Sequence, residues 1–372
     1  MSTAAAESTE DKPIRREVTA PYMRWAKTHR RATWDMTGSN LLACTLDDLP
    51  EAREALELAG DNDNGYRPLL EAVGARYHVS PDMVTTAAGT SGANFLVAAA
   101  LLEPGDDVLV ERPGYDPLTA VARIFGATVR RFERRFENGF ALDPDEVRLA
   151  LRPTTRLIVL TSPHNPSGVI ASSDALDAVG RLAESVGARV LVDEVYLDAA
   201  FDSSTRPAAT RSPVFITTNS LTKAYGLAGL RCGWVIAAPE VTARVARMHD
   251  LVDAIGAFPA ERLALAAFRH LDRLAARAHA HIERNGRLVR DFLRSRADLE
   301  WVDGPLGLVL FPRVRGVEDA SPLVERWFER HDVGVVAGRF FDLPAHFRIA
   351  MGGRTEVIAG ALERLGRALD EA

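Results

Sequence analysis

Cysteine and lysine are both scarce in this chain of 372 residues. The two cysteines, Cys44 and Cys232, do not form a Cys-x-x-Cys pair, so a disulfide framework and a cysteine-based zinc site lack support. Isolated thiols are typical of a reducing compartment, and we expect a cytoplasmic protein without a metal site. Because lysine is rare, Lys223, between a predicted strand and a glycine-rich segment, is a candidate for chemistry.

Long apolar runs and an excess of basic charge are also missing. The longest apolar stretch, around residues 95–102, is too short to cross a bilayer, and the start lacks the apolar core of a signal peptide. With 45 basic and 51 acidic residues the formal net charge is -6, which gives no electrostatic reason to expect nucleic acid or a membrane as partner. Residues 1–20 are polar and small, and we expect a mobile arm there.

What the sequence does contain is an alternation of predicted helices and strands in an ordinary globular composition, with 47% apolar and 26% charged residues. Short β-branched runs that end in polar residues, such as 156–163, 188–196 and 213–220, are separated by helical patterns. Strands of this kind predict a parallel sheet that helices cover on both faces. A helical pattern over 259–295 has no internal proline and is long enough to bridge two domains.

We therefore expect an α/β fold with a large domain, built on a mostly parallel sheet covered by helices, and a smaller α+β domain. The large domain is predicted at residues 50–270, and the smaller one at residues 21–49 together with 271–372. In parallel sheets of this kind, ligands bind at the carboxyl ends of the strands. The polar residues that end the predicted strands therefore stand where chemistry is expected.

Four segments lie at such positions: AAGTSGAN (87–94), SPHNPSG (162–168), DEVY (193–196) and SLTKAYGLAGLRCGW (220–234). Each one alone is weak, and Asn-Pro-Ser-Gly is usually a turn. In this order and spacing they resemble the fold-type I pyridoxal-phosphate (PLP) enzymes, specifically the class I and II aminotransferases, over roughly residues 35–372. The resemblance implies PLP as cofactor, an amino acid and a 2-oxo acid as small-molecule substrates, and a homodimer.

The resemblance also assigns roles to single residues. Lys223 would hold PLP as a Schiff base and then act as general acid and base at the substrate Cα. Asp193, at the end of an apolar strand, would keep the pyridine nitrogen protonated, so that the ring can act as an electron sink. Asn165 and Tyr196 would donate to the phenolate oxygen of the ring, and Tyr115 would stack on its face.

The phosphate of PLP would be held by a helix N-terminus, hydroxyl groups and a guanidinium group. The matching residues are Gly89, Thr90, Ser91, Ser220 and Arg231. Arg348, in HFRIAMGG, matches the arginine that grips the substrate α-carboxylate, because a planar fork suits a carboxylate; the alternative is a surface salt bridge. Gly38 matches the N-terminal segment that approaches the substrate, and Asn165 is expected beside it.

Three functions remain open. The first is an aminotransferase with ping-pong chemistry. The second keeps the cofactor but is a β-elimination (carbon–sulfur) lyase or another enzyme that forms a carbanion at Cα. The third is a non-catalytic ligand-sensing domain, for which the few dozen residues before the fold are too few to add a DNA-binding module. No second arginine can be assigned to a substrate side chain, so the substrate is not identified.

One segment departs from the family pattern. In GDNDNGYRPLL (60–70), many relatives carry a tyrosine five residues before the second glycine, where it binds the phosphate in the neighbouring subunit. Here that position is Gly60. The contact is then missing, or it is made by Asn62, Asn64 or Tyr66. His164, inside SPHNPSG, does not discriminate between reactions, and a structural role is expected for it.

Overall fold

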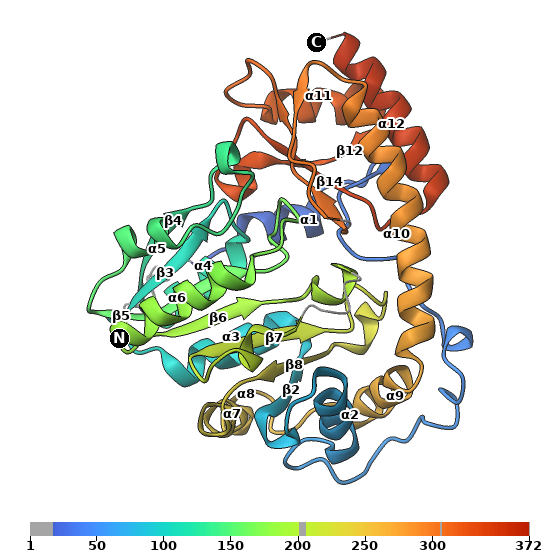
Figure 1. Ribbon diagram of the computed structural model, residues 1–372. Coiled ribbons are helices and arrows are strands. Elements are labelled where there is room, and N and C mark those ends of the chain that lie inside the picture. Colours follow the sequence, from blue (N-terminus) through green and yellow to red (C-terminus); the bar gives the residue numbers. More distant parts are fainter. Residues whose placement is uncertain (1–17, 201–205, 306, 372) are drawn as a thin grey trace, which may run out of the picture.

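The computed structural model describes residues 18–200, 206–305 and 307–371, so most of the predicted arm at residues 1–20 lies outside the described residues. Its centre is a seven-stranded sheet (Figure 1). In the order of pairing the strands are β2 (Val84–Ala88), β8 (Cys232–Ile236), β7 (Phe215–Ser220), β6 (Arg189–Asp193), β5 (Thr155–Thr161), β3 (Asp107–Arg112) and β4 (Thr128–Glu133). Strand β8 is antiparallel to both neighbours, and the other pairs are parallel. The predicted, mostly parallel sheet is thus confirmed.

Helices cover both faces of this sheet, as the continuous apolar strands predict. One face packs on α3 (Gly89–Leu101), α4 (Asp116–Ile124) and α7 (Pro239–Ala246), followed by the short α8 (His249–Val252). The other face packs on α5 (Pro144–Ala150) and α6 (Ser173–Ser185), and on α2 (Arg67–Tyr77) and α9 (Phe258–Phe268) near β2 and β8. Every side chain from Val190 to Asp193 of β6 is buried, because the strand has no solvent-facing side.

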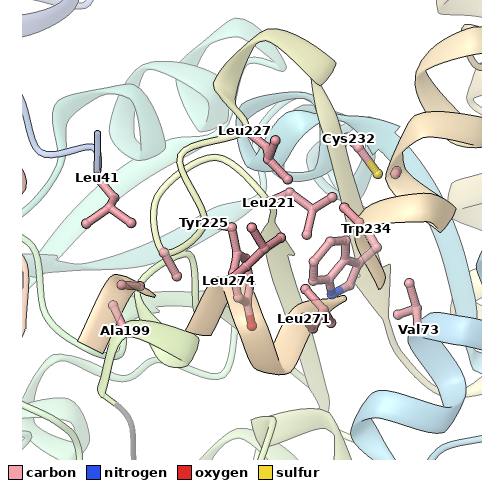
Figure 2. Close-up of a cluster of buried hydrophobic side chains, with 14 of the residues drawn as sticks. Leu41, Val73, Ala199, Leu221, Tyr225, Leu227, Cys232, Trp234, Leu271 and Leu274 are labelled. Atoms are coloured by element: carbon pink, nitrogen blue, oxygen red, sulfur yellow. The ribbon is translucent and has the colours of Figure 1, made fainter. Parts of the chain in front are cut away.

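A long helix, α10 (Leu271–Arg294), connects this layer to the rest of the molecule (Figure 1). Figure 2 shows Leu271 and Leu274 of its first turn in a buried apolar cluster that also contains Trp234 of β8. The single helix predicted over 259–295 is wrong, because α9 ends at Phe268 and His270 leaves the helical region with φ of -123°. No proline or glycine marks this break. It lets α9 pack against α2 while α10 follows another direction.

The second part of the fold is small and mixed. Its strands are β1 (Trp34–Asp35), β9 (Leu299–Glu300), β10 (Val309–Leu310), β11 (Arg313–Val314), β12 (Val333–Gly334), β13 (Val336–Ala337) and β14 (Phe347–Ala350). Parallel pairing of β1 with β12 brings two segments together that lie 299 positions apart in the sequence. Helices α11 (Ser321–His331) and α12 (Thr355–Asp370) cover these strands and share a buried cluster with Val289 of α10.

The N-terminal helix α1 (Pro21–Thr28) lies between the two parts of the fold (Figure 1). Its residue Tyr22 is buried against Phe341 of the short 3-10 helix η7 (Gly338–Phe341). Within the described ranges, no helix is both long enough and apolar enough to cross a membrane.

Candidate active site

A cavity of about 1160 Å³ opens at the carboxyl ends of the parallel strands. The strands β5, β6 and β7 end there at Thr161, Asp193 and Ser220. The predicted site residues that line this cavity are Gly38, Thr90, Ser91, Tyr115, Asn165, Asp193, Tyr196, Ser220, Lys223, Arg231 and Arg348. Gly89 does not line the cavity itself but contacts Arg231 directly behind it. The structure thus brings together residues that the sequence separates by more than three hundred positions.

Hydroxyl, amide and guanidinium groups gather at the N-terminus of α3. The Thr90 hydroxyl donates to Ser220 Oγ at 2.9 Å, and Arg231 Nη2 donates to the carbonyl oxygen of Ala88 at 3.1 Å. Gly89 has φ of +71°, and a Cβ atom there would collide with the Arg231 guanidinium. Only glycine therefore allows Arg231 to reach across the helix N-terminus. This end of the cavity is suited to an anion.

Asp193 is a buried carboxylate that lines the same cavity. Its Oδ2 accepts from Asn94 Nδ2 at 2.8 Å, and its Oδ1 accepts from the backbone N–H of Val195 at 3.1 Å. Burial raises its pKa, while these donors and the Lys223 charge act in the opposite direction. Asn94 is itself fixed by the hydroxyl of Thr218, which donates to Asn94 Oδ1 at 2.6 Å. The carboxylate is therefore held in one orientation.

Lys223 projects from the loop after β7 and is partly buried. Its Nζ donates to Ser39 Oγ at 3.0 Å and to Asn40 Oδ1 at 2.7 Å. Burial, followed by repulsion from Arg348, lowers its pKa from 10.5 to about 7, although Asp193 opposes this shift. A large fraction of this amine is thus unprotonated, and nucleophilic, near neutral pH.

Three further side chains, those of Tyr196, Asn165 and Tyr115, line the cavity. The Tyr196 hydroxyl is buried and has no hydrogen-bond partner in the described part of the chain, and burial raises its pKa to about 12. The backbone N–H of Asn165 donates to Thr161 Oγ1 at 3.0 Å, which fixes the loop after β5. The Tyr115 hydroxyl donates to the Met23 sulfur at 3.1 Å. Tyr196 thus offers an unused donor to whatever occupies the cavity.

A buried ion pair contacts the end of β5, where the loop with Asn165 begins. Arg134 Nη1 donates to Glu111 Oε2 at 3.0 Å and to the carbonyl oxygen of Thr161 at 3.1 Å. Both charged side chains are almost completely buried, so removal of either one would leave an uncompensated charge in the interior. His164 is also buried: Nδ1 contacts Ser167 Oγ at 2.7 Å, and Nε2 contacts the Pro113 carbonyl oxygen. Burial lowers the pKa of His164, which leaves the ring neutral.

Arg348 lies on β14 and is completely buried, so it is not part of a surface salt bridge. Its Nη1 donates to Asn165 Oδ1 at 3.1 Å, and its Nη2 donates to the Tyr22 hydroxyl at 2.6 Å and to the Thr37 carbonyl oxygen at 3.0 Å. Its Nε has no partner among the described residues. A buried cation without a carboxylate partner faces the cavity, which suits an anionic ligand group.

Comparison with known proteins decides the family. Residues 37–365 match the family described as aminotransferase class I and II. The chain belongs to this family. It is 34% identical to the capreomycidine synthase of Streptomyces vinaceus over 77% of this chain and 74% of that one. It is 30% identical to the arginine–pyruvate transaminase of Pseudomonas aeruginosa, over 81% and 80% of the two chains.

The fold agrees with this assignment. A crystal structure of a PLP-dependent aminotransferase from Streptococcus suis superposes with a TM-score of 0.88 at 24% identity, and covers 94% of this chain and 96% of that one. The activity of this chain is amino-group transfer, and its cofactor is PLP. Its substrates are of the amino-acid and 2-oxo-acid classes.

The residues of this aminotransferase fit PLP. The buried Asp193 has no cationic partner within hydrogen-bonding distance among the described residues, as a group that binds a pyridinium nitrogen requires. Arg231, which packs on Gly89, lines the same cavity as Asp193, and Lys223 provides an amine with a lowered pKa. The unused hydroxyl of Tyr196 also matches a cofactor oxygen.

Several residues of the site were missed at the level of sequence. Ser39 and Asn40 contact Lys223. They directly follow Gly38 in the DMTGSN segment, of which only Gly38 was assigned a role from the sequence. Asn94 orients Asp193, and it ends the AAGTSGAN motif without having been assigned a role. Tyr22 lies in a segment to which no family motif drew attention.

Proposed function

We propose a specific division of labour among the site residues of this aminotransferase. PLP, when bound, supplies an electron sink that weakens the Cα–H bond of the substrate. Lys223 holds the cofactor covalently and moves the proton at the substrate Cα. Asp193 keeps the ring nitrogen protonated, and Asn165 and Tyr196 donate to the ring oxygen. The observation that carries this proposal is that an amine of lowered pKa and a buried, oriented carboxylate line one cavity.

The remaining groups bind and position. Arg231 and the α3 N-terminus hold the phosphate, together with the hydroxyls of Thr90, Ser91 and Ser220. Tyr115 packs on the ring face. Arg348 binds the substrate α-carboxylate, with Asn165 and Gly38 beside it; the burial of Arg348 without an anionic partner supports this role. The reaction then runs in two halves, in which an amino acid leaves as its 2-oxo acid before a second 2-oxo acid takes up the amino group.

A panel of amino donors tests this proposal. Purified holoenzyme is mixed with single amino acids, arginine and aspartate among them, without any acceptor. We expect at least one donor to convert bound PLP into the pyridoxamine form, with one equivalent of 2-oxo acid released. Ammonia and pyruvate formed from cystathionine would instead assign the protein to the β-elimination lyases.

The role of Lys223 has its own test. Lys223→Ala should remain folded, because the side chain lines a cavity, but should lose turnover by at least about 1000-fold as the proton carrier is removed. Borohydride should attach PLP to the unchanged protein and not to the variant. Lys27→Ala, which removes an exposed lysine of α1, is the control and should still be labelled. Labelling of Lys223→Ala at the same level would remove Lys223 from this role.

A homodimer is the second part of the proposal. Large apolar side chains are exposed along residues 46–58 and 251–255, and among them Leu58 is 85% and Leu251 is 81% exposed. Exposed apolar patches of this kind mark interaction surfaces. Gly60 follows the first of these segments, and a Cβ there would collide with the ring of Phe258, so this ring would have to move to admit the tyrosine of many relatives. Asn62 is buried and bound to Glu261, whereas Asn64 and Tyr66 are less buried, although each accepts a hydrogen bond from an arginine; we propose Asn64 or Tyr66 for a phosphate contact across the interface.

The domain division and the compartment also remain proposals. We propose that residues 50–270 form the cofactor-binding domain, and that residues 21–49 and 271–372 form the smaller domain. Two buried clusters on the central sheet lie wholly within the first range, and the cluster of α11, α12 and Val289 lies wholly within the second, which supports this division. The cluster around Trp234 spans both ranges. A cytoplasmic location is supported by Cys44 and Cys232, which are both free thiols.

A further inference from the structure

Tyr22 connects three parts of the molecule. Its backbone N–H donates to Asp116 Oδ2 of α4 at 2.9 Å, which fixes the first turn of α1 on the large sheet layer. Its ring contacts Tyr115 edge-on, with 6.0 Å between the ring centroids, and packs on Phe341 of η7. Its hydroxyl accepts from Arg348 at 2.6 Å. Tyr22 is thus held firmly enough to place one oxygen atom beside the Arg348 guanidinium.

The geometry of guanidinium makes this oxygen important. A carboxylate binds a guanidinium through two parallel hydrogen bonds, either along the Nε–Nη2 edge or along the Nη1–Nη2 edge. Both edges include Nη2. In Arg348, Nη2 donates to the Tyr22 hydroxyl and the Thr37 carbonyl oxygen, whereas Nε has no partner among the described residues. Both hydrogens of Nη2 thus have acceptors, so a carboxylate on either edge shares a hydrogen of Nη2 with the hydroxyl of Tyr22 or the carbonyl oxygen of Thr37, or replaces one of them.

The Tyr22 hydroxyl can take part in such a complex because it is also a donor. In the contact with Arg348 the oxygen serves as acceptor, and its own hydrogen has no acceptor in the part of the chain that the structure describes. Tyr22 lines the same cavity as Arg348, Lys223 and Tyr115. The hydroxyl hydrogen is therefore free to point at a carboxylate oxygen on Arg348.

We propose that Tyr22 is a second group for recognition of the substrate α-carboxylate: its hydroxyl accepts from Arg348 and donates to the carboxylate. This inference rests on the proposed role of Arg348 and adds the N-terminal helix to the substrate site. Asp116, through the backbone of Tyr22, and Phe341, through the ring, position the hydroxyl. Carboxylate recognition then combines residues from α1 and β14, which lie near opposite ends of the chain.

Tyr22→Phe tests the inference, because it removes the hydroxyl and keeps the ring contacts. The ligands are 2-methylalanine, which lacks a Cα hydrogen and is not turned over, and tert-butylamine, in which a methyl group replaces the carboxylate. Binding to the holoenzyme is followed by the change in the absorbance of bound PLP. We expect Tyr22→Phe to weaken 2-methylalanine about 10-fold, as for a hydrogen bond to a charged group, and to leave tert-butylamine unchanged.

Control variants separate the possible results. Tyr77→Phe removes another buried phenol hydroxyl, bonded to Asp198 outside the cavity, and should not change either affinity. Arg348→Lys should reduce the preference for 2-methylalanine over tert-butylamine; an unchanged preference would contradict the proposed role of Arg348. If Arg348→Lys has this effect and Tyr22→Phe does not, only the inference on Tyr22 fails. Tighter binding of 2-methylalanine by Tyr22→Phe would also overturn it, since Tyr22 would then compete with substrate.

Discussion

At the scale of single residues, the environment of Lys223 sets when its amine can react. Burial and the Arg348 charge bring its pKa to about 7, so the amine is mostly protonated below this pH and mostly neutral above it. We therefore expect the rate at which apoprotein takes up PLP to rise with pH, with a midpoint near 7. The absorbance of protein-bound PLP, recorded in stopped-flow experiments between pH 5 and pH 10, measures this rate.

A variant without the charge of Arg348 serves as the control in the same experiment. In Arg348→Met the second-largest cause of the lowered pKa is gone, so the midpoint should move to higher pH. Asp193 raises the pKa of Lys223 and stays in place in this variant. A midpoint near 10 in the unchanged protein would show that the amine is solvated like an ordinary surface lysine.

The sequence reveals some residues of the site and hides others for a physical reason. Lys223 and Asp193 stand next to strand ends, inside short motifs, where a local pattern reports their chemistry. Their partners come from distant segments: Asn94 is 99 residues from Asp193, and Ser39 is 184 residues from Lys223. A hydrogen bond that closes so large a loop leaves no periodicity in the chain, and only the fold shows it.

At the scale of elements, the close approach of β8 to α3 shapes the anion-binding end of the cavity. A Cβ atom on Gly233 of β8 would lie 2.5 Å from the backbone carbon of Gly89 and 2.9 Å from the carbonyl oxygen of Asn219. Neither neighbour is a flexible side chain. Gly233→Ala should therefore push β8 away from the start of α3, lower the free energy of unfolding by about 2 kcal/mol and weaken PLP binding.

Urea unfolding and PLP titration measure these two effects. Gly229→Ala, four residues earlier, is the matched control, because no atom lies within 4 Å of a Cβ there. It should leave both quantities within about 0.5 kcal/mol of the unchanged protein. Equal effects of the two substitutions would mean that contact between β8 and α3 does not determine the cavity.

The strands of the large sheet can be predicted from the sequence, because their β-branched runs have no polar face and this pattern is local. The antiparallel direction of β8 cannot be predicted, since the sequence pattern of a strand buried on both faces is the same in either orientation. The break between α9 and α10 is also hidden. Residues 269–270 are Arg and His, which fit a helix, and it is the packing of α9 on α2 that decides where the helix ends.

At the scale of the whole molecule, we propose that two copies associate through an apolar surface to which the exposed segments 46–58 and 251–255 contribute. Leu251→Asp places a charge in this surface and should shift the protein from dimer to monomer. Leu149→Asp is the control, because Leu149 is 77% exposed on α5, outside that surface. Sedimentation velocity at micromolar concentration distinguishes the two states. A Leu251→Asp variant that stays dimeric would place the interface elsewhere.

The pairing of β1 with β12 could not be predicted from the sequence. Two strands of two residues each carry no alternation, and 299 positions separate Trp34 from its partner Val333. The sequence nevertheless predicts that the smaller part is of mixed α and β type, since the helical pattern over residues 355–372 and the short apolar runs before it are local. The sequence does not show which of these runs pair with each other, because the pairing depends on the fold that brings residues 34–35 beside residues 333–334.

The wide separation of Tyr22 and Arg348 has a consequence for biosynthesis. The groups around the coenzyme follow one another between residues 89 and 231, so a ribosome delivers them in a single continuous stretch. Arg348, which we propose for recognition of the carboxylate, is translated 117 residues after Arg231. The groups proposed to hold the coenzyme are therefore all synthesised before the residue proposed to select amino acids.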